Sequence, residues 1–292
     1  MNRTYRLVRA KAARSKLRVA RAWFWHLGVK QQDIFQASYP RSGSTWLRFI
    51  LFQILRGEES GFGKIDQCIP EIYTHRGIRP ILPGGGRLIK THEKYRADYT
   101  KAVFLVRDLR DVVLSCYATG LAPIVSKGDF DSFLLSFLQG RALQMGSWQE
   151  HTRSWLESPL VKNGNLMIVR YEDLRPNPEE TILRLLRFLE VTPDLQSVRK
   201  AIEDNSLVKM RAKEDRARNI GERSDLLPAR KAPGEEGRFV RKGAVGGWRD
   251  KLSNTQQKLI NQYAGDMLAA LGYEAGETGE PRTETMISAF GV

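Results

Sequence analysis

Residues 39–50 read Tyr-Pro-Arg-Ser-Gly-Ser-Thr-Trp-Leu-Arg-Phe-Ile, and this stretch decides the fold. Before it, residues 33–38 (Asp-Ile-Phe-Gln-Ala-Ser) have the composition of a short buried strand. After it, residues 46–55 are mostly apolar, which predicts an amphipathic to nearly buried helix. The stretch therefore predicts a strand, a tight polar turn and a helix.

The predicted turn has the residues of an anion site. Gly43 lets the backbone approach a ligand closely, and Ser42, Ser44 and Thr45 offer hydroxyls beside the free N–H groups of a helix start. The positive end of the helix dipole favours an anion there, and Arg41 adds a full charge. The alternative is an ordinary Ser/Thr-capped helix after a strand. The Walker pattern is absent, because no Gly-Lys-Ser/Thr follows the turn.

Size and charge narrow the class of protein. A chain of 292 residues with 41% hydrophobic residues is long enough for one large α/β domain with a sizeable core. The net charge of +14 predicts attraction to polyanions, anionic lipids or small anionic substrates. Residues 1–30 hold nine Lys/Arg and no Asp/Glu, so the remainder of the chain is only about +5.

The sulfur and imidazole side chains give no sign of a metal site. Only Cys68 and Cys116 occur, neither at a metal-like spacing from a histidine, and the four histidines are scattered. We therefore expect no disulfide, no metal and a reducing, cytoplasmic compartment. There is no run of 18 apolar residues, so no membrane span is predicted.

Strands and helices alternate along the rest of the chain. Short apolar runs predict further strands, and longer periodic segments predict helices. The predicted strands cover 87–92, 102–106 and 165–170, and the predicted helices cover 108–117, 129–157 (one or two helices), 178–190, 194–204 and 255–271. This alternation is typical of an α/β fold with a parallel sheet.

The two ends of the chain lie outside the predicted domain of residues 32–275. Residues 1–31 carry an apolar stripe on a basic background, which predicts a basic amphipathic N-terminal extension. It could lie on an anionic membrane as a peripheral contact, act as a transit peptide, or pack its aromatic residues on the domain. Residues 276–292 are expected to form a flexible tail.

Residues 211–243 differ from the rest of the domain. They are rich in Arg and Lys, contain Gly and Pro, and have few apolar residues. We expect a loop that is either disordered or an active-site lid, with an anion as its partner.

Polar side chains follow each of the four predicted strands. They are residues 41–45 after the first, Lys90 and His92 after the second, Arg107 after the third and Tyr171 after the fourth. Because ligands bind parallel sheets at the carboxyl ends of the strands, we expect these groups to share one rim.

Several motifs at this rim resemble those of the PAPS-dependent sulfotransferases of the cytosolic type, where PAPS is 3′-phosphoadenosine 5′-phosphosulfate. The resemblance runs from about residue 33 to 271. Its parts are the 41–46 loop, Lys90-Thr91-His92, Arg107 with Ser115, Tyr171-Glu172-Asp173, Ser206 with Met210, and residues 239–248 (Phe-Val-Arg-Lys-Gly-Ala-Val-Gly-Gly-Trp).

The resemblance implies a P-loop-like three-layer sandwich, with a central parallel sheet flanked by helices, and a site for PAPS and its product adenosine 3′,5′-bisphosphate (PAP). The nucleotide-binding residues it implies are Arg41, Ser42, Gly43, Ser44, Thr45, Trp46, Arg107, Ser115, Tyr171, Ser206, Met210, Phe239, Arg241, Lys242 and Gly243.

The same resemblance implies a mechanism. His92 would be the general base that takes the proton of an acceptor hydroxyl, or less favourably of an amine, on a small molecule or lipid. Lys90 and Arg41 would stabilise the charge that builds on the leaving oxygen.

The sequence departs from the family pattern at three positions, where Arg41, Leu207 and Gly247 replace the usual Lys, Phe and Asp. A P-loop kinase of small molecules is an alternative, but Gly-Lys-Ser/Thr is missing. A nucleotide-binding scaffold without catalysis is a second alternative. Nucleic-acid binding is not expected, because the basic residues concentrate in the N-terminal extension and one lid without an aromatic-basic module.

Overall fold

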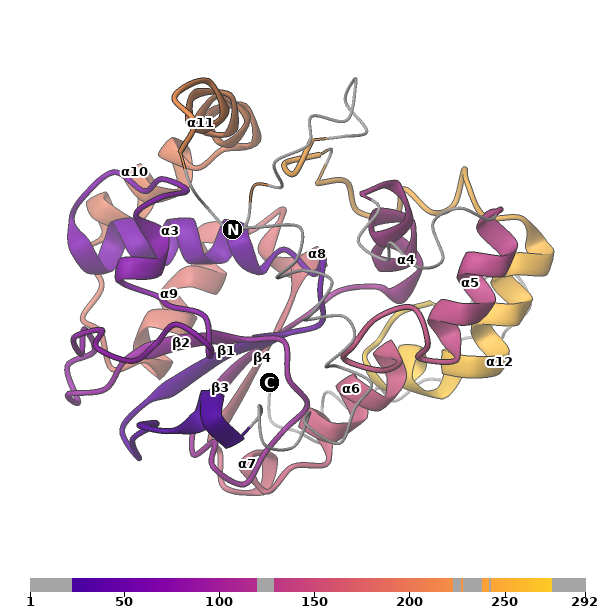
Figure 1. Cartoon of the computed structure of the whole chain (residues 1–292), viewed down its shortest axis with the longest axis horizontal. Coiled ribbons are helices and arrows are strands. Elements are labelled where there is room, and N and C mark those ends of the chain that lie inside the picture. The colour runs from indigo at the N-terminus through magenta and orange to yellow at the C-terminus, as the bar shows by residue number, and fades with distance from the viewer. Residues whose placement is uncertain (1–22, 120–128, 223–226, 228–237, 242, 275–292) are drawn as a thin grey trace.

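The computed structural model describes residues 23–119, 129–222, 227, 238–241 and 243–274. All four predicted strands are present within one or two residues of their expected ends, and each is followed by a helix or a polar turn (Figure 1). The elements are β1 (Ile34–Ser38), α3 (Ser44–Arg56), a 3₁₀ helix η1 (Ile65–Gln67), β2 (Leu88–Thr91), β3 (Ala102–Val106), α4 (Leu109–Ala118), α5 (Phe130–Leu138), α6 (Trp148–Leu156), α7 (Pro159–Lys162), β4 (Leu166–Arg170), α8 (Tyr171–Leu174), α9 (Pro178–Phe188), α10 (Leu195–Asp204), α11 (Leu207–Asn219) and α12 (Asn254–Ala270).

The four strands form one parallel sheet in the order β2-β1-β3-β4. The chain leaves β1 for β2 on one side and then returns to β3 on the other side of β1. The point at which the strand order reverses therefore lies between β1 and β3, and open α/β sheets bind ligands at such a point. The turn at 39–43 and Arg107 follow these two strands.

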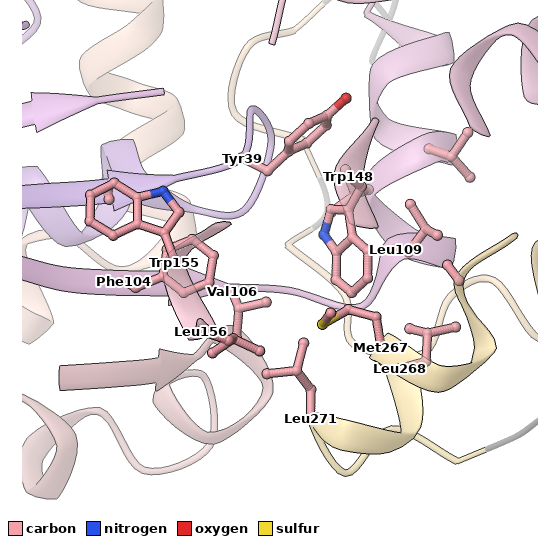
Figure 2. Packing of buried hydrophobic residues seen from close by; sticks show 14 of the residues in the cluster. Tyr39, Phe104, Val106, Leu109, Trp148, Trp155, Leu156, Met267, Leu268 and Leu271 are labelled. Carbon is pink, nitrogen blue, oxygen red and sulfur yellow. The ribbon is translucent and has the colours of Figure 1, made fainter. Parts of the chain in front are cut away.

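Side chains alternate between the two faces of the sheet, as the pleat requires. Phe104 and Val106 pack with α4, α5, α6 and α12, and Figure 2 shows Phe104, Trp148, Trp155 and Leu268 in this cluster. Val103 and Leu105 point to the other face and pack with α3, α9 and α10. Figure 1 shows the two helix groups on opposite sides of the sheet. The predicted three-layer sandwich is confirmed.

Several helix ends carry the expected caps. The side chain of Asp108 accepts a hydrogen bond from the backbone N–H of Arg110 at the start of α4. Pro178 occupies the first turn of α9, where its missing N–H costs nothing. The segment 129–157, predicted as one or two helices, forms α5 and α6.

The expectation of a loop from residue 211 is wrong for its first part, because α11 spans Leu207–Asn219. The segment has too few apolar residues to show the 3.6-residue period of a helix. Its Ala, Lys, Glu and Arg residues nevertheless favour helix formation. Met210 and Ala217 face a small apolar cluster with Phe49 and Phe62. The ion pair between Arg218 and Glu214, at 2.8 Å, adds a contact along the helix.

Within the described ranges, no helix is long and apolar enough to cross a membrane. The N-terminal extension up to residue 22, most of the segment 223–237, Lys242 and the tail from residue 275 lie outside the described residues.

Candidate active site

The turn after β1 has the geometry of an anion site. Arg41 and Gly43 both have left-handed backbone angles, with φ of 72° and 93°, which turn the chain sharply into α3. Gly43 caps α3 without a side-chain hydrogen bond, and the first turn of the helix has no acidic residue. The hydroxyl of Ser42 is buried and has no hydrogen-bond partner among the described residues. Free helix N–H groups, the dipole and this hydroxyl fit a phosphate or sulfate group.

Arg41 extends from this turn toward α4. Its Nε donates to Oγ of Ser115 at 3.0 Å, and its Nη2 donates to the carbonyl of Phe239 at 3.2 Å. Burial lowers the pKa of Arg41 to about 10, and the charges of Arg241 and Arg107 add to this effect. The guanidinium therefore remains charged at neutral pH and ready to pair with an anion.

Arg107 lies between the turn and the segment after residue 242. Its Nη1 donates to the carbonyl of Arg41 at 3.2 Å and its Nη2 to the carbonyl of Ala244 at 2.8 Å. Its guanidinium also lies 4.5 Å from the ring centre of Tyr171, whose hydroxyl donates to the carbonyl of Gly243 at 3.0 Å. The two motifs expected to hold the 3′-phosphate thus meet in space, although they are more than a hundred residues apart in sequence.

The residues expected near the adenine of the nucleotide lie on or beside α3 and α11. Nε1 of Trp46 donates to the carbonyl of Asn205 at 2.8 Å, and its ring meets Tyr171 edge-on at 6.2 Å between ring centres. Ser206 is the residue before α11, and Met210 is buried on that helix. Ser44 is buried and Thr45 half-buried at the start of α3.

The remaining expected residues of the loop before α12 are only partly placed. The carbonyl of Arg241 accepts a hydrogen bond from Arg211 at 3.2 Å. Lys242 lies outside the described residues. Next to Gly247, the N–H of Gly246 donates to Oδ2 of Asp111 at 2.9 Å.

Lys90 and His92 meet at the end of β2. Nδ1 of His92 donates to the carbonyl of Ser38 at 2.6 Å, which leaves the lone pair on Nε2. Nζ of Lys90 lies 2.7 Å from that Nε2 and donates to it. Burial first, and then the charge of Lys90, hold the pKa of His92 well below its ordinary value. His92 is therefore a neutral base with a fixed tautomer at neutral pH.

Residues 31–272 match the profile of the family described as "Sulfotransferase domain". The chain belongs to the sulfotransferase family. The predicted enzyme class is thereby confirmed.

Relatives and solved structures agree with this sulfotransferase assignment. Sulfotransferase 1E1 of Mus musculus is 23% identical over 258 residues, covering 80% of this chain and 83% of the relative. The crystal structure of mouse sulfotransferase SULT7A1 complexed with PAP gives a TM-score of 0.60 at 22% identity, covering 82% of this chain and 84% of that one. The crystal structure of retinol dehydratase in complex with androsterone and the inactive cofactor PAP gives a TM-score of 0.62 at 20% identity. The match covers 89% of this chain and 85% of that one. These structures support the fold.

The structure of the sulfotransferase also reveals polar residues that the sequence analysis did not select. Glu71 binds Lys90, and Arg48 binds Glu71, in a buried group behind His92. Glu214 is fully buried and accepts the backbone N–H groups of Phe239 and Val240 at 2.9 and 2.8 Å. A signal existed for Arg48, because a charge inside a nearly apolar helix requires a buried partner. Glu214 lies in a polar segment that gives no such signal, and Glu71 lies in a Gly- and Pro-rich stretch without a helical or strand period.

A metal centre is not apparent in the described part of the sulfotransferase, where no group of three His, Cys, Asp or Glu side chains could hold an ion. The site consists instead of cations, hydroxyls and one neutral imidazole. This set of groups suits the binding of an anionic donor and the removal of one proton.

Proposed function

We propose that the protein transfers the sulfuryl group of PAPS to a hydroxyl, or less favourably an amine, of a small-molecule or lipid acceptor. The observation that carries the proposal is the pair Lys90 and His92. A lysine ammonium and a neutral imidazole lone pair lie 2.7 Å apart, and the imidazole is tied to Ser38 just before the anion-binding turn.

The donor fits the residues of the rim. The turn 41–45 would hold the 5′-phosphate end, through the buried hydroxyl of Ser42 and the N–H groups at the start of α3. Arg107, Ser115 and the segment 241–243 would hold the 3′-phosphate. The adenine would be contacted by Trp46, Ser206, Met210 and Phe239. Tyr171 would also contact the nucleotide. Bound PAPS supplies the activated sulfuryl group.

His92 would accept the proton of the acceptor hydroxyl on Nε2. Because burial keeps this imidazole neutral, Nε2 carries a lone pair and no proton at any pH near 7, and it can take the proton once Lys90 no longer donates to it. The bond from Nδ1 to the Ser38 carbonyl keeps the lone pair directed toward Lys90 and also stabilises the charged form once the proton has arrived.

Lys90 and Arg41 would stabilise the negative charge that collects on the leaving oxygen. Arg41 provides a planar fork that can reach two oxygens at once, whereas Lys90 provides a point charge. The protein therefore contributes one base and two cations, and no metal is required in this scheme.

The acceptor class rests on similarity. One structural neighbour, retinol dehydratase, was solved with androsterone bound. From this similarity we infer for the present protein only that its acceptor is a small molecule or lipid with a free hydroxyl.

A cytoplasmic location is supported by the two thiols. Cys68 and Cys116 are both free and buried, as expected in a reducing compartment. Peripheral contact with an anionic membrane is supported by the basic composition of residues 1–31 and by Trp23 and Phe24, which are 63% and 48% exposed.

The proposal is tested by calorimetric titration with PAP and with adenosine 5′-phosphate. We expect a clear preference for PAP and its loss in Arg107→Ala. Equal affinity for the two nucleotides would contradict the proposal. His92→Ala should keep PAP affinity but lose sulfuryl transfer from PAPS to a panel of phenols, alcohols and amines, and unchanged transfer would assign the base elsewhere.

A further inference from the structure

Glu71 lies beside Lys90 because the segment 70–72 pairs with β2. The N–H of Lys90 donates to the carbonyl of Pro70 at 2.8 Å, and the N–H of Ile72 donates to the carbonyl of Lys90 at 2.9 Å. Glu71 and Lys90 form an isolated parallel bridge in this arrangement. Two backbone bonds therefore fix the position of Glu71 relative to Lys90, and its carboxylate is buried, with 6% exposure.

The ammonium of Lys90 uses all three of its hydrogens within the protein. It donates to both carboxylate oxygens of Glu71, at 2.7 and 2.9 Å, and to Nε2 of His92 at 2.7 Å. A lysine ammonium has three donors and no more. A bond from Lys90 to any other oxygen must therefore replace one of these three.

The charges around Lys90 are balanced by its neighbours. Arg48 of α3 donates to Oε1 of Glu71 at 3.3 Å and to Oδ1 of Asp66 at 2.6 Å. Lys90, Arg48 and Glu71 are all buried, so removal of one charge would leave the others uncompensated.

We propose that Glu71 is a positioning residue of the sulfotransferase site, which holds the ammonium of Lys90 on Nε2 of His92 and so covers the general base. Lys90 uncovers the base when it exchanges His92 for an oxygen of the transferring group while Glu71 retains it. The assignment of this role rests on the proposed function, whereas the contact network itself does not.

The charged and titratable groups around the pair determine what a substitution would do. The pKa of Lys90 is shifted by burial and by the charges of Glu71, Arg48 and Asp66. The pKa of His92 is lowered by burial and by Lys90, His151 of α6 and Arg48. In Glu71→Gln, Lys90 loses its ion-pair partner and faces the like charge of Arg48 with only Asp66 to offset it, so it releases its ammonium contact or its proton. His92 then loses the nearest positive charge and its pKa rises, while burial still holds that pKa below its ordinary value.

The test is ¹⁵N NMR of the histidine rings in the full-length protein. The chain has four histidines, and His92→Gln assigns the signals of His92. In the wild-type protein we expect the His92 signals to stay those of the neutral Nδ1–H tautomer from about pH 8 to about pH 5.5. In Glu71→Gln the onset of protonation should move up into this range, a shift of at least about one pH unit.

Two further variants make the result specific. Glu71→Asp keeps the charge with a shorter reach and should give an intermediate titration. Glu93→Gln removes a carboxylate next to His92 in sequence and should leave the titration unchanged. A Glu71→Gln protein with native circular dichroism and wild-type His92 signals would overturn the proposal. If that variant does not fold, wild-type signals in Glu71→Asp would overturn it.

Calorimetry with PAP separates this proposal from the proposed function. We expect Glu71→Gln to bind PAP within about threefold of wild type, because the side chain of Glu71 contacts Lys90 and Arg48 and not the turn 41–45. Failure of the wild-type protein to bind PAP would remove the proposed function, but it would leave the His92 titration as a separate result.

Discussion

The ring of Tyr171 lies directly against Gly43, so that a Cβ built on Gly43 would fall 2.5 Å from Cδ2 of Tyr171. This contact joins the turn after β1 to the residue after β4. The hydroxyl of Tyr171 also donates to the carbonyl of Gly243 at 3.0 Å, so one side chain joins the two segments that we propose bind phosphate.

Gly43→Ala should therefore disrupt the site. The substitution adds a clash with Tyr171 and places alanine at a φ of 93°. We expect a loss of about 2 kcal/mol or more in the free energy of unfolding and at least about tenfold weaker PAP binding. Thermal unfolding and calorimetry measure both. Gly61→Ala is the control, because a Cβ there meets nothing within 4 Å. Equal effects of the two substitutions would show that the contact has no special role.

Arg41→Lys tests whether the guanidinium fork matters. Arg41 binds Ser115 and Phe239 at once, and a lysine has only one nitrogen for these two partners. We expect about tenfold weaker PAP binding by calorimetry. The same exchange at Arg56, which is half-exposed in a surface ion pair with Glu58, should have no measurable effect. Full affinity in Arg41→Lys would mean that charge alone is sufficient.

Glu214→Gln should loosen the segment that carries Phe239 and Val240. The carboxylate accepts both of their N–H groups and binds Arg218, whereas an amide has one acceptor oxygen and no charge. We expect about 1–3 kcal/mol lower stability and several-fold weaker PAP binding. The neighbouring variant Asp215→Asn removes only a partly exposed ion pair with Arg238 and serves as the control. If both variants behave alike, the buried carboxylate does not anchor the segment.

Acid should destabilise the protein through its buried histidines. Burial lowers the pKa of His151 to about 3 in the folded protein, against about 6.5 in the unfolded chain. The unfolded state therefore binds more protons between these values, and stability falls as the pH decreases below about 6.5. From pH 7.5 to pH 5 this histidine alone removes about 2 kcal/mol.

His151→Leu should reduce this pH dependence. The ring contacts Tyr39 and Phe104, so an apolar side chain suits the site. Urea unfolding at the two pH values measures the difference. The free energy of unfolding of the variant should still increase with pH, because burial lowers the pKa values of His75 and His92 as well. An unchanged difference between the two pH values would contradict the assignment to His151.

Membrane contact is tested by flotation with anionic and neutral vesicles. We expect the full chain to float with phosphatidylserine vesicles, and a chain without residues 1–22 to remain in solution, because most basic residues of 1–30 are removed. Trp23→Ser with Phe24→Ser tests the exposed aromatic side chains separately. Equal recovery of the full and shortened chains would remove the membrane contact from the proposal.

Local sequence signals were sufficient to predict the sheet, most of the helices and the polar rim. Strand composition, the cap at Asp108 and the polar residues after each strand are local signals, and parallel strands bring their carboxyl ends to one edge whatever the details of packing. The placement of Lys90, His92, Arg107 and Tyr171 at this edge was therefore predictable, and the structure brings Lys90 to His92 and Arg107 to Tyr171. The helical part of 211–243 was missed because its buried face has only a few apolar residues, Met210 and Ala217 among them.

The partners of Lys90 and Phe239 could not be predicted from local signals, because they come from distant segments of the chain. Glu71 is nineteen residues from Lys90 and Glu214 is twenty-five from Phe239, and no period or motif links either pair. Their meeting depends on how the 70–72 segment pairs with β2 and on how α11 packs beside α3. The cost of removing charges from water means that a buried carboxylate needs a partner, and for Glu71 and Glu214 the partners Lys90 and the Phe239 and Val240 N–H groups come from segments that only the packing brings together.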